Sequence, residues 1–385
     1  MKRIAILTIF NNNNNYGGVL QAYALQHVLR EKGYIAEVIV YVNGQNPIYK
    51  SVREQLKQYK VNEIIHKALG KVEGKIFNKR IINILQDREY LFDNFRKVYI
   101  SSSKPYDDNS LVDSQKIYDA YICGSDQIWN PNAARNGFLL SMIDEKHCKI
   151  AYAASIGRST LTEYEKSIMI PLIKRFDFVS VREKTAQEIL NESGVNDVNV
   201  VLDPTLLIDK VEWESICNIK SIREKYVLCY FFSDSRAYRT KIEKYCKQHN
   251  LKLYYIPYAN QSYTKGDAEG DGICLEKIGP IEFLSYINQA ECVFTDSFHG
   301  TVFSILFEKK FVVFEREQKK QQASKNSRLY DLLECFNLKD RLYSQKDIKY
   351  YMDTEIEYQM VNVKLRESRK KSLDFLWNSL NGLEK

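Results

Sequence analysis

Short apolar runs alternate with helical patterns along almost the whole chain. The first run, RIAILTIF at 3–10, has the continuous apolar character of a strand that is buried on both faces. An amphipathic helix, VLQAYALQHVLREKG, follows and ends at Gly33, and IAEVIVY at 35–41 is the next strand. This order of elements predicts βα units with parallel strands.

The alternation divides the chain into two parts. In the first part, further strands are predicted at 116–123, 149–155, 177–181 and 198–203. After PTLLIDKVEWESI the pattern restarts, with strands predicted at 226–232, 252–258, 292–296 and 310–315. We therefore predict an α/β fold with two Rossmann-like, doubly wound domains that face a cleft. They would cover residues 1–210 and 211–354, and a helix within 355–385 would pack back on the first domain.

Composition excludes several classes of protein. The chain has 385 residues, of which 44% are hydrophobic and 27% charged, which is typical of a globular protein with two sizeable cores. No window reaches the roughly 18 apolar residues of a membrane span, and MKRIAILTIF is interpreted as a first strand instead of a signal peptide. We therefore expect a cytoplasmic protein. The 8 cysteines are scattered, so neither a disulfide framework nor a metal site is expected.

The net charge of +7 leaves one question about partners open. No nucleic-acid-binding module accompanies the basic residues, so nucleic acid is not expected as a partner. Much of the excess lies between Lys50 and Lys97, in a segment with a helical pattern. This segment is either a solvated helix face or a surface that meets anionic lipid or a phosphate-bearing acceptor, as in peripheral membrane contact.

Ligands of doubly wound sheets bind beyond the carboxyl ends of the strands, so polar residues at those ends are candidates. The first such segment is NNNNNYGG, which includes Tyr16, Gly17 and Gly18. Its glycines would leave the following helix N-terminus open to an anion. Because the segment lacks GxGxxG spacing, a flexible turn is an equally good interpretation.

The second polar segment is GSDQIWNP at 124–131. Asp126 could act as a base toward a hydroxyl, Trp129 could stack on a sugar ring, and Gln127 and Asn130 could supply hydrogen bonds, with Ser125 in the same set. The alternative is an Asx-turn that places Trp129 in the core.

Three more strand ends carry polar residues. Arg182 in SVRE could hold a carboxylate or phosphate, or form an ion pair with Glu183. LDPT at 202–205 is interpreted as a capped turn. His299 follows a buried strand, together with Asp296, Ser297 and Gly300, and we expect it near a helix N-terminus in a loop that faces the cleft.

Six sequence blocks together resemble one known family. They are YGGVLQAYALQ, CGSDQIWNP, AYAASIG, SVREKTAQEIL, VLDPTLLI and TDSFHGTVFSI, in that order. Their order over nearly the whole chain resembles the polysaccharide pyruvyl transferase family. The resemblance implies a GT-B-like fold and the transfer of pyruvate from phosphoenolpyruvate onto a sugar of a surface glycan, such as a capsule polysaccharide, or its lipid-linked precursor. It implies no metal and no organic cofactor, with phosphoenolpyruvate as a co-substrate.

The resemblance also implies roles for single residues. By its match to the family's histidine motif, His299 would be the general acid and a phosphate contact, and Arg182 would clamp the donor together with Ser297 and Gly300. Where many members have Arg-Leu-His, this chain has Ser297-Phe298-His299. Arg328 or Arg316 would then have to supply the missing charge.

Two alternatives from other functional classes stay open. A GT-B glycosyltransferase would share the fold but use a nucleotide-sugar donor. A non-catalytic family member would bind glycan within a biosynthetic complex. Tyr258 and Tyr263, in the polar loop 257–272, would suit sugar stacking but are also ordinary interface residues.

Overall fold

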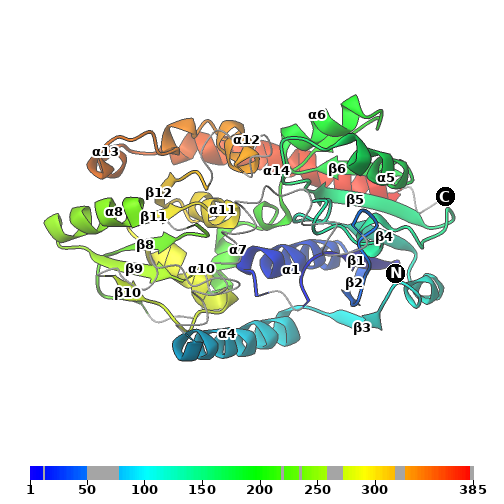
Figure 1. Cartoon of the computed structure of the whole chain (residues 1–385), viewed down its shortest axis with the longest axis horizontal. Helices are drawn as coiled ribbons and strands as arrows, with labels where there is room; N and C mark the ends of the chain where they lie inside the picture. The colour runs from blue at the N-terminus through cyan, green and yellow to red at the C-terminus, as the bar shows by residue number, and fades with distance from the viewer. Residues whose placement is uncertain are drawn as a thin grey trace.

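The computed structural model describes residues 1–11, 14–49, 78–217, 221–233, 236–257, 272–316 and 326–381. Within this part of the chain, two parallel β-sheets lie side by side along the long axis of the molecule (Figure 1). We refer to the half built on each sheet as the first and the second domain.

The first domain contains a seven-stranded sheet in which every strand is parallel to its neighbours. Its order is β3 (Ser102–Tyr106), β2 (Ile35–Tyr41), β1 (Arg3–Leu7), β4 (Ala120–Cys123), β5 (Cys148–Ala154), β6 (Phe178–Val181) and β7 (Asn199–Val200). The helices of this part are α1 (Tyr16–Glu31), α4 (Asn78–Tyr99), α5 (Glu163–Ile173), α6 (Lys184–Glu192) and α7 (Lys210–Ile216), with 3₁₀ turns η1 (Leu111–Lys116), η2 (Gly137–Leu139) and η3 (Pro204–Leu206).

The second domain contains a five-stranded parallel sheet. Its order is β10 (Ile273–Cys274), β9 (Lys252–Ile256), β8 (Tyr226–Tyr230), β11 (Cys292–Thr295) and β12 (Lys310–Val313). Its helices are α8 (Arg236–Gln248), α10 (Pro280–Gln289), α11 (Phe298–Leu306), α12 (Ser327–Cys335), α13 (Ile348–Asp353) and α14 (Tyr358–Asn381), with a 3₁₀ turn η4 (Lys339–Arg341).

Side-chain alternation along the strands explains how the two domains join. In β1, Ile4 and Ile6 enter one apolar cluster, and Ala5 and Leu7 enter another on the opposite face. In the same way, alternate residues of β8 enter two clusters. One cluster contains residues from both sheets, so one face of each sheet covers a core that the domains share.

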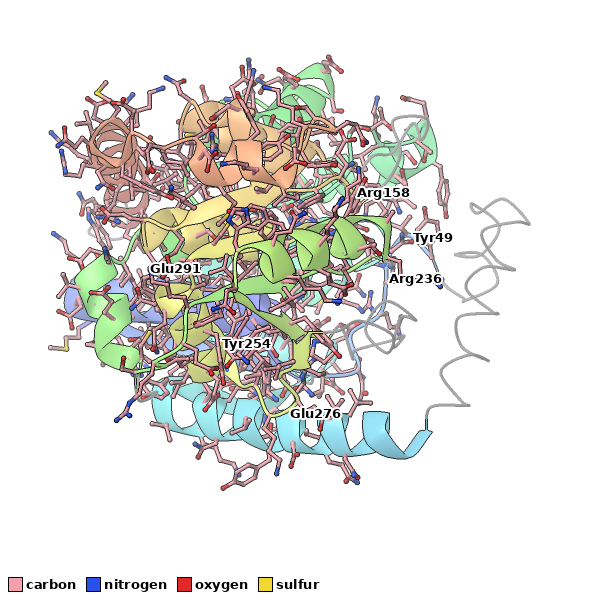
Figure 2. All side chains as sticks on the ribbon, turned by 90° about the vertical axis from the view of Figure 1, so that its left-hand side faces the viewer. Tyr49, Arg158, Arg236, Tyr254, Glu276 and Glu291 are labelled. Carbon is pink, nitrogen blue, oxygen red and sulfur yellow. The ribbon has the colours of Figure 1, made fainter. Side chains whose placement is uncertain are left out.

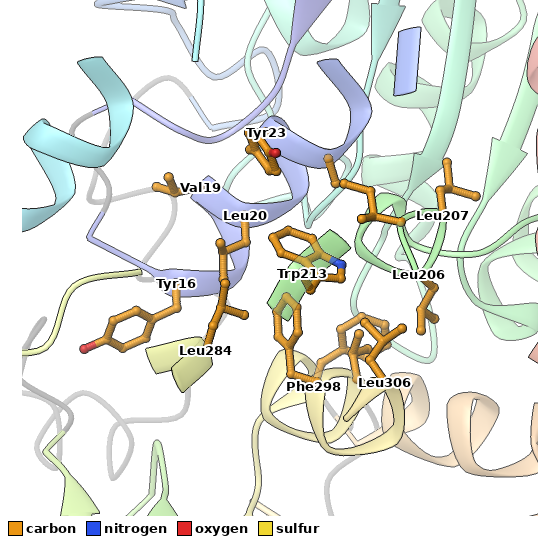
Figure 3. Packing of buried hydrophobic residues seen from close by; sticks show 14 of the residues in the cluster. Tyr16, Val19, Leu20, Tyr23, Leu206, Leu207, Trp213, Leu284, Phe298 and Leu306 are labelled. Atoms are coloured by element: carbon orange, nitrogen blue, oxygen red, sulfur yellow. The ribbon is translucent and has the colours of Figure 1, made fainter. Parts of the chain in front are cut away.

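The shared core fills part of the seam between the domains. Figure 3 shows Tyr16 and Leu20 of α1 beside Leu284 of α10, and Trp213 of α7, whose ring packs against Phe303 of α11. All five side chains are at most 5% exposed. The seam is therefore a packed apolar interior here, and the polar cluster described below lies at its side.

Two long helices also connect the domains. Helix α14 reaches the first domain, where Ser372 Oγ accepts a hydrogen bond from Leu202 N at 2.9 Å and Trp377 stacks near Tyr34. Helix α4 contacts α1 in the first domain and α10 in the second. Figure 2 looks onto the end of the molecule formed by the second sheet, where Tyr254 of β9 is labelled and α4 runs along the base.

The strands predicted from apolar runs are present in the structure, with ends that differ by a few residues. Strands β3 and β10 were not predicted. Both lie at sheet edges, where one side of the backbone needs no partner strand. For this reason β10 can be short and β3 can contain Pro105.

The basic segment 50–77 and the loop 258–271, with Tyr258 and Tyr263, lie outside the described residues. Among the helices described, none combines the length and the apolar character that a membrane span requires.

Candidate active site

His299 lies in the first turn of α11 and not in the loop expected from the sequence. Strand β11 ends at Thr295, and Ser297 is the N-cap of α11 because its Oγ accepts a hydrogen bond from Gly300 N at 3.2 Å. A Cβ on Gly300 would come within 2.7 Å of Thr295 Oγ1. Ser297 and Gly300 therefore shape the turn that holds the imidazole.

The imidazole of His299 packs directly against the first domain. Its side chain is 9% exposed. A Cβ on Gly17, at the start of α1, would lie 1.8 Å from His299 Nδ1 and 2.3 Å from two ring carbons. Only glycine therefore allows α1 and α11 to approach each other in this way.

Asp203 faces His299 from the first domain. Its Oδ2 lies 3.6 Å from His299 Nε2 and accepts hydrogen bonds from Ser125 Oγ and Arg182 Nη1, both at 2.9 Å. Its Oδ1 accepts from Thr205 N at 3.1 Å and Thr205 Oγ1 at 2.7 Å. Burial alone would raise the pKa of Asp203, but His299, Arg182 and these hydrogen bonds hold it well below its usual range.

Arg182 lies at the centre of the cluster. Its fully buried side chain also approaches Asp126 Oδ1 at 3.5 Å and Glu183 Oε2 at 3.6 Å. The guanidinium lies 4.4 Å from the centre of the Phe298 ring. Burial raises the pKa of Glu183, although Arg182 opposes this shift. Arg182 therefore forms the expected ion pair with Glu183 while also lying in the candidate site.

A second arginine also lies near Phe298. Arg328, in the first turn of α12, is 5% exposed and lies 5.9 Å from the centre of the Phe298 ring. Burial and the charges of Arg182 and Arg316 lower the pKa of Arg328 to about 9. Among the described residues, Arg328 has no ion-pair partner. Arg316 already has a hydrogen-bond partner, because its Nε donates to Asp296 O at 2.8 Å.

Several buried donor atoms in this cluster have no hydrogen-bond acceptor. They are Arg182 Nε and Nη2, which lie at ion-pair distance from Glu183 Oε2 and Asp126 Oδ1, and Arg328 Nε. His299 Nε2, Ser327 Oγ and Glu183 Oε2 beside them are also unpaired. An unpaired buried donor typically costs about 1–3 kcal/mol, and more when it is charged. Such a group of donors suits a ligand that brings several anionic oxygens.

The segment GSDQIWNP supplies only part of the expected acceptor site. Asp126 has a positive φ of 63° and is 7% exposed, and Gln127 is half-buried beside Gly157. Ser125 is fully buried against Asp203. Asn130 forms an Asx-turn, accepting from Asn132 N at 3.1 Å and donating to Ile156 O at 3.0 Å.

Trp129 requires a correction. Its side chain is 0% exposed, and its indole N–H donates to Phe138 O at 3.2 Å. The ring packs edge-on against Phe176 in the core of the first domain. No face of the ring is available to a sugar, because burying the indole among apolar side chains lowers the free energy of the folded protein relative to exposing it to water.

The segment at the start of α1 also differs from the expectation. Asn15 Oδ1 accepts hydrogen bonds from Gly17 N at 3.0 Å and Gly18 N at 3.4 Å, so a side-chain cap occupies the helix N-terminus that was expected to hold an anion. Tyr16 is 1% exposed, donates to Ile278 O at 3.0 Å and stacks on Phe283 at 4.4 Å. Tyr16 and Gly18 are therefore part of the seam and are not surfaces for an acceptor.

A cavity of about 420 Å³ adjoins the cluster. It lies between α6, α12 and α14, and Arg182, Asp203 and Phe298 contribute to its wall together with Lys184, Lys371 and Ser368. This volume is within the range of small-molecule sites.

Three members of the cluster were not identified from the sequence. Asp203 was interpreted as part of a capped turn, Glu183 only as an ion-pair partner, and Phe298 only as a departure from the family motif. The available signal for Asp203 was its position at the end of a predicted strand, at the same sheet edge as Arg182.

Comparison with known proteins identifies one family. A family model described as polysaccharide pyruvyl transferase matches residues 15–318. Among curated proteins, no significant relative of the sequence is found.

Solved structures with a similar fold include UDP-N-acetylglucosamine 2-epimerases. The Rickettsia bellii enzyme has a TM-score of 0.54 and 11% identity, over 100% of this chain and 98% of the other. The Neisseria meningitidis enzyme bound to UDP-GlcNAc has a TM-score of 0.51 and 11% identity, over 98% and 100%. The Methanocaldococcus jannaschii enzyme has a TM-score of 0.51 and 12% identity, over 95% and 93%. At these identities the similarity establishes the two-domain, GT-B-like fold alone.

Proposed function

The chain belongs to the polysaccharide pyruvyl transferase family, and we propose that it transfers pyruvate from phosphoenolpyruvate to a sugar. The acceptor would be a surface polysaccharide or its lipid-linked precursor, and two hydroxyls of one sugar would become bridged by a ketal. Fold and family alone would also suit another transferase, so the donor has to be argued from the site.

The observation that carries the proposal is the group of buried cationic donors without acceptors. Arg182 and Arg328 both lie near the Phe298 ring, and both have N–H groups without a hydrogen-bond partner. Phosphoenolpyruvate carries a carboxylate and a phosphate, whose oxygens would satisfy these donors and restore the charge balance around Arg328.

This arrangement also accounts for the departure from the family's Arg-Leu-His motif. Ser297 stands where many members have arginine, but Arg328 reaches the neighbourhood of Phe298 from the start of α12. We propose that Arg328 supplies the missing charge. Arg316 is less suited to this role, because its Nε already donates to the Asp296 carbonyl.

In the proposed reaction, His299 donates a proton to the methylene carbon of phosphoenolpyruvate, and the neighbouring carbon becomes electron-poor. One sugar hydroxyl adds to that carbon and gives its proton to a base, for which we propose Asp126. The carbon–oxygen bond to phosphate then breaks, its electron pair leaves with phosphate, and the second hydroxyl adds and loses its proton. One of the two released protons restores His299, and the other leaves with phosphate. Of the expected acceptor contacts, we retain Asp126, Gln127 and Asn130.

Thermal unfolding with candidate donors tests the proposal. At a hundredfold excess over its dissociation constant, phosphoenolpyruvate should raise the free energy of unfolding of the wild type by about 2.7 kcal/mol relative to the free protein. Inorganic phosphate should stabilise the protein less. Arg328→Gln should lose this effect. The control is Arg223→Gln, which replaces an exposed arginine before β8 and should keep the effect.

The ketal methyl group formed with a suitable glycan can then be followed by proton NMR. In that assay His299→Ala should lose about 10²–10⁴-fold in rate.

Other outcomes would contradict the proposal in different ways. Stabilisation by a nucleotide sugar and not by phosphoenolpyruvate would identify a glycosyltransferase on the same fold. Unchanged turnover in His299→Ala would remove this histidine from the mechanism. Glycan binding without any donor effect would indicate a non-catalytic member of the family.

A further inference from the structure

We infer that Asp203 is the positioning residue for His299, and that it holds the imidazole across the seam between the two domains. The role of His299 in proton transfer rests on the proposed function. The contact between the two side chains does not, and it can be tested separately.

The Asp203 carboxylate is a fixed and charged group. Its side chain is 0% exposed, and both oxygens accept hydrogen bonds, from Thr205 on one side and from Ser125 and Arg182 on the other. Such a carboxylate cannot rotate without breaking several hydrogen bonds. It therefore presents Oδ2 to His299 in one orientation.

His299 Nε2 has a reason to pair with that oxygen. The atom is buried and has no hydrogen-bond partner, and Asp203 Oδ2 lies 3.6 Å away. A hydrogen bond would need a shift of a few tenths of an ångström, and such contacts often tighten only when substrate is bound. Gly17 closes the opposite edge of the ring, so the imidazole has little room to turn away.

The other charged groups around the ring do not replace Asp203. Arg182 and Glu183 follow β6, Asp126 follows β4, and Arg328 lies in the first turn of α12. Among the described residues, Asp203 is the one acid within ion-pair distance of His299. Asp203 Oδ2 already accepts a hydrogen bond from Arg182 Nη1, so this one oxygen faces both the guanidinium and the imidazole of His299.

This geometry selects one form of the ring. A hydrogen on Nε2 would point at Asp203, which leaves Nδ1, on the Gly17 side of the ring, without a hydrogen. The carboxylate would also stabilise the positive charge that the ring carries before it donates its proton. Because Asp203 and His299 belong to different domains, the ring is oriented only while the seam is closed.

Nitrogen NMR of the histidine rings tests the inference without an enzymatic assay. The chain has 5 histidines, so a spectrum of His299→Gln assigns the His299 ring by its absence. At high pH, where the ring is neutral, the wild type should show His299 with its hydrogen on Nε2. In Asp203→Asn the pattern should change toward a mixture of both tautomers.

Asp209→Asn is the matched control. Asp209 caps α7 through Glu212 N at 2.9 Å, and asparagine caps a helix equally well. This variant should leave the His299 spectrum unchanged. If Asp203→Asn does not fold, the wild-type spectrum alone decides, because a hydrogen on Nδ1 of neutral His299 would overturn the inference.

Kinetics separates this inference from the proposed function. If phosphoenolpyruvate is the donor, Asp203→Asn should lower kcat by at least about tenfold, as a part of the roughly 10²–10⁴-fold that general acid catalysis contributes, with a smaller change in KM. A wild type without pyruvyl transfer but with the expected tautomer would overturn the function and leave the positioning role intact. An unchanged tautomer in folded Asp203→Asn would overturn the positioning role, whatever the reaction.

Discussion

Gly17 and His299 share one space between the domains, and a side chain at Gly17 would compete with the ring. A Cβ there would lie 1.8 Å from Nδ1. We expect Gly17→Ala to lower the free energy of unfolding by about 1–3 kcal/mol, as overpacking of a rigid interior does. In the background of His299→Ala, where the ring is absent, the same substitution should cost much less.

Urea unfolding of the wild type, both single variants and the double variant gives this coupling directly. The cycle needs no knowledge of the substrate. An equal cost of Gly17→Ala in both backgrounds would mean that the glycine is required for another reason, such as the start of α1.

Arg328 should make the binding of phosphoenolpyruvate depend on pH. Because its pKa is lowered to about 9, the free protein keeps this charge below about pH 9 and loses it above. A bound anion favours the protonated form, so binding above pH 9 takes up a proton and should weaken by up to about tenfold per pH unit.

Calorimetric titration between pH 7.5 and about pH 10.5 would show this weakening. Arg328→Gln should bind weakly over the whole range, without the added loss above about pH 9, where the pKa of Arg328 lies. A wild-type affinity that stays constant through pH 10 would show that Arg328 keeps its charge there, and equal affinities of the wild type and Arg328→Gln would show that Arg328 does not contact the anion.

The sequence identified several site candidates because they follow buried strands at one sheet edge. Asp126 lies 3.5 Å from Arg182, and Arg182 and His299 both approach Asp203, at 2.9 and 3.6 Å. Trp129 could not be assigned in the same way. Whether an indole next to polar residues faces solvent or the core depends on contacts with segments distant in sequence, such as Phe138 and Phe176.

At the scale of elements, apolar periodicity predicted the buried strands well because both faces of a parallel sheet are covered. β3, with the sequence SSKPY, carries little of that signal because it lies at the edge. The shared core could not be predicted either. Periodicity shows which residues of β1 and β8 are buried, but not that the two sheets turn these faces to one interior.

Helix α11 offers a test of how an element positions the site. Ser297→Ala removes the acceptor of Gly300 N, and the loss of an N-cap should lower the free energy of unfolding by about 1 kcal/mol. Ser297→Thr keeps a hydroxyl and should lose much less. Urea unfolding compares the three proteins. Equal stabilities would show that the start of α11 is held by its surroundings and not by its cap.

For the whole molecule, the shared core predicts that the domains unfold together. Trp213 is 0% exposed and joins three regions, since it donates to Thr205 O at 3.0 Å, packs edge-on against Phe303 of α11 and contacts Tyr23 of α1. Separate domains usually unfold in separate steps. Here, exposing one domain would also expose apolar surface of the other.

Scanning calorimetry should therefore show one transition for the wild type, with equal calorimetric and van 't Hoff enthalpies. Trp213→Ala, which empties part of the seam, should lower the free energy of unfolding by about 3–5 kcal/mol. If the domains depend on this core, the variant should either unfold in one transition at a lower temperature or separate into two. Two transitions in the wild type would show that each domain is stable alone. The orientation of His299 by Asp203 would then depend on a seam that can open without unfolding either domain.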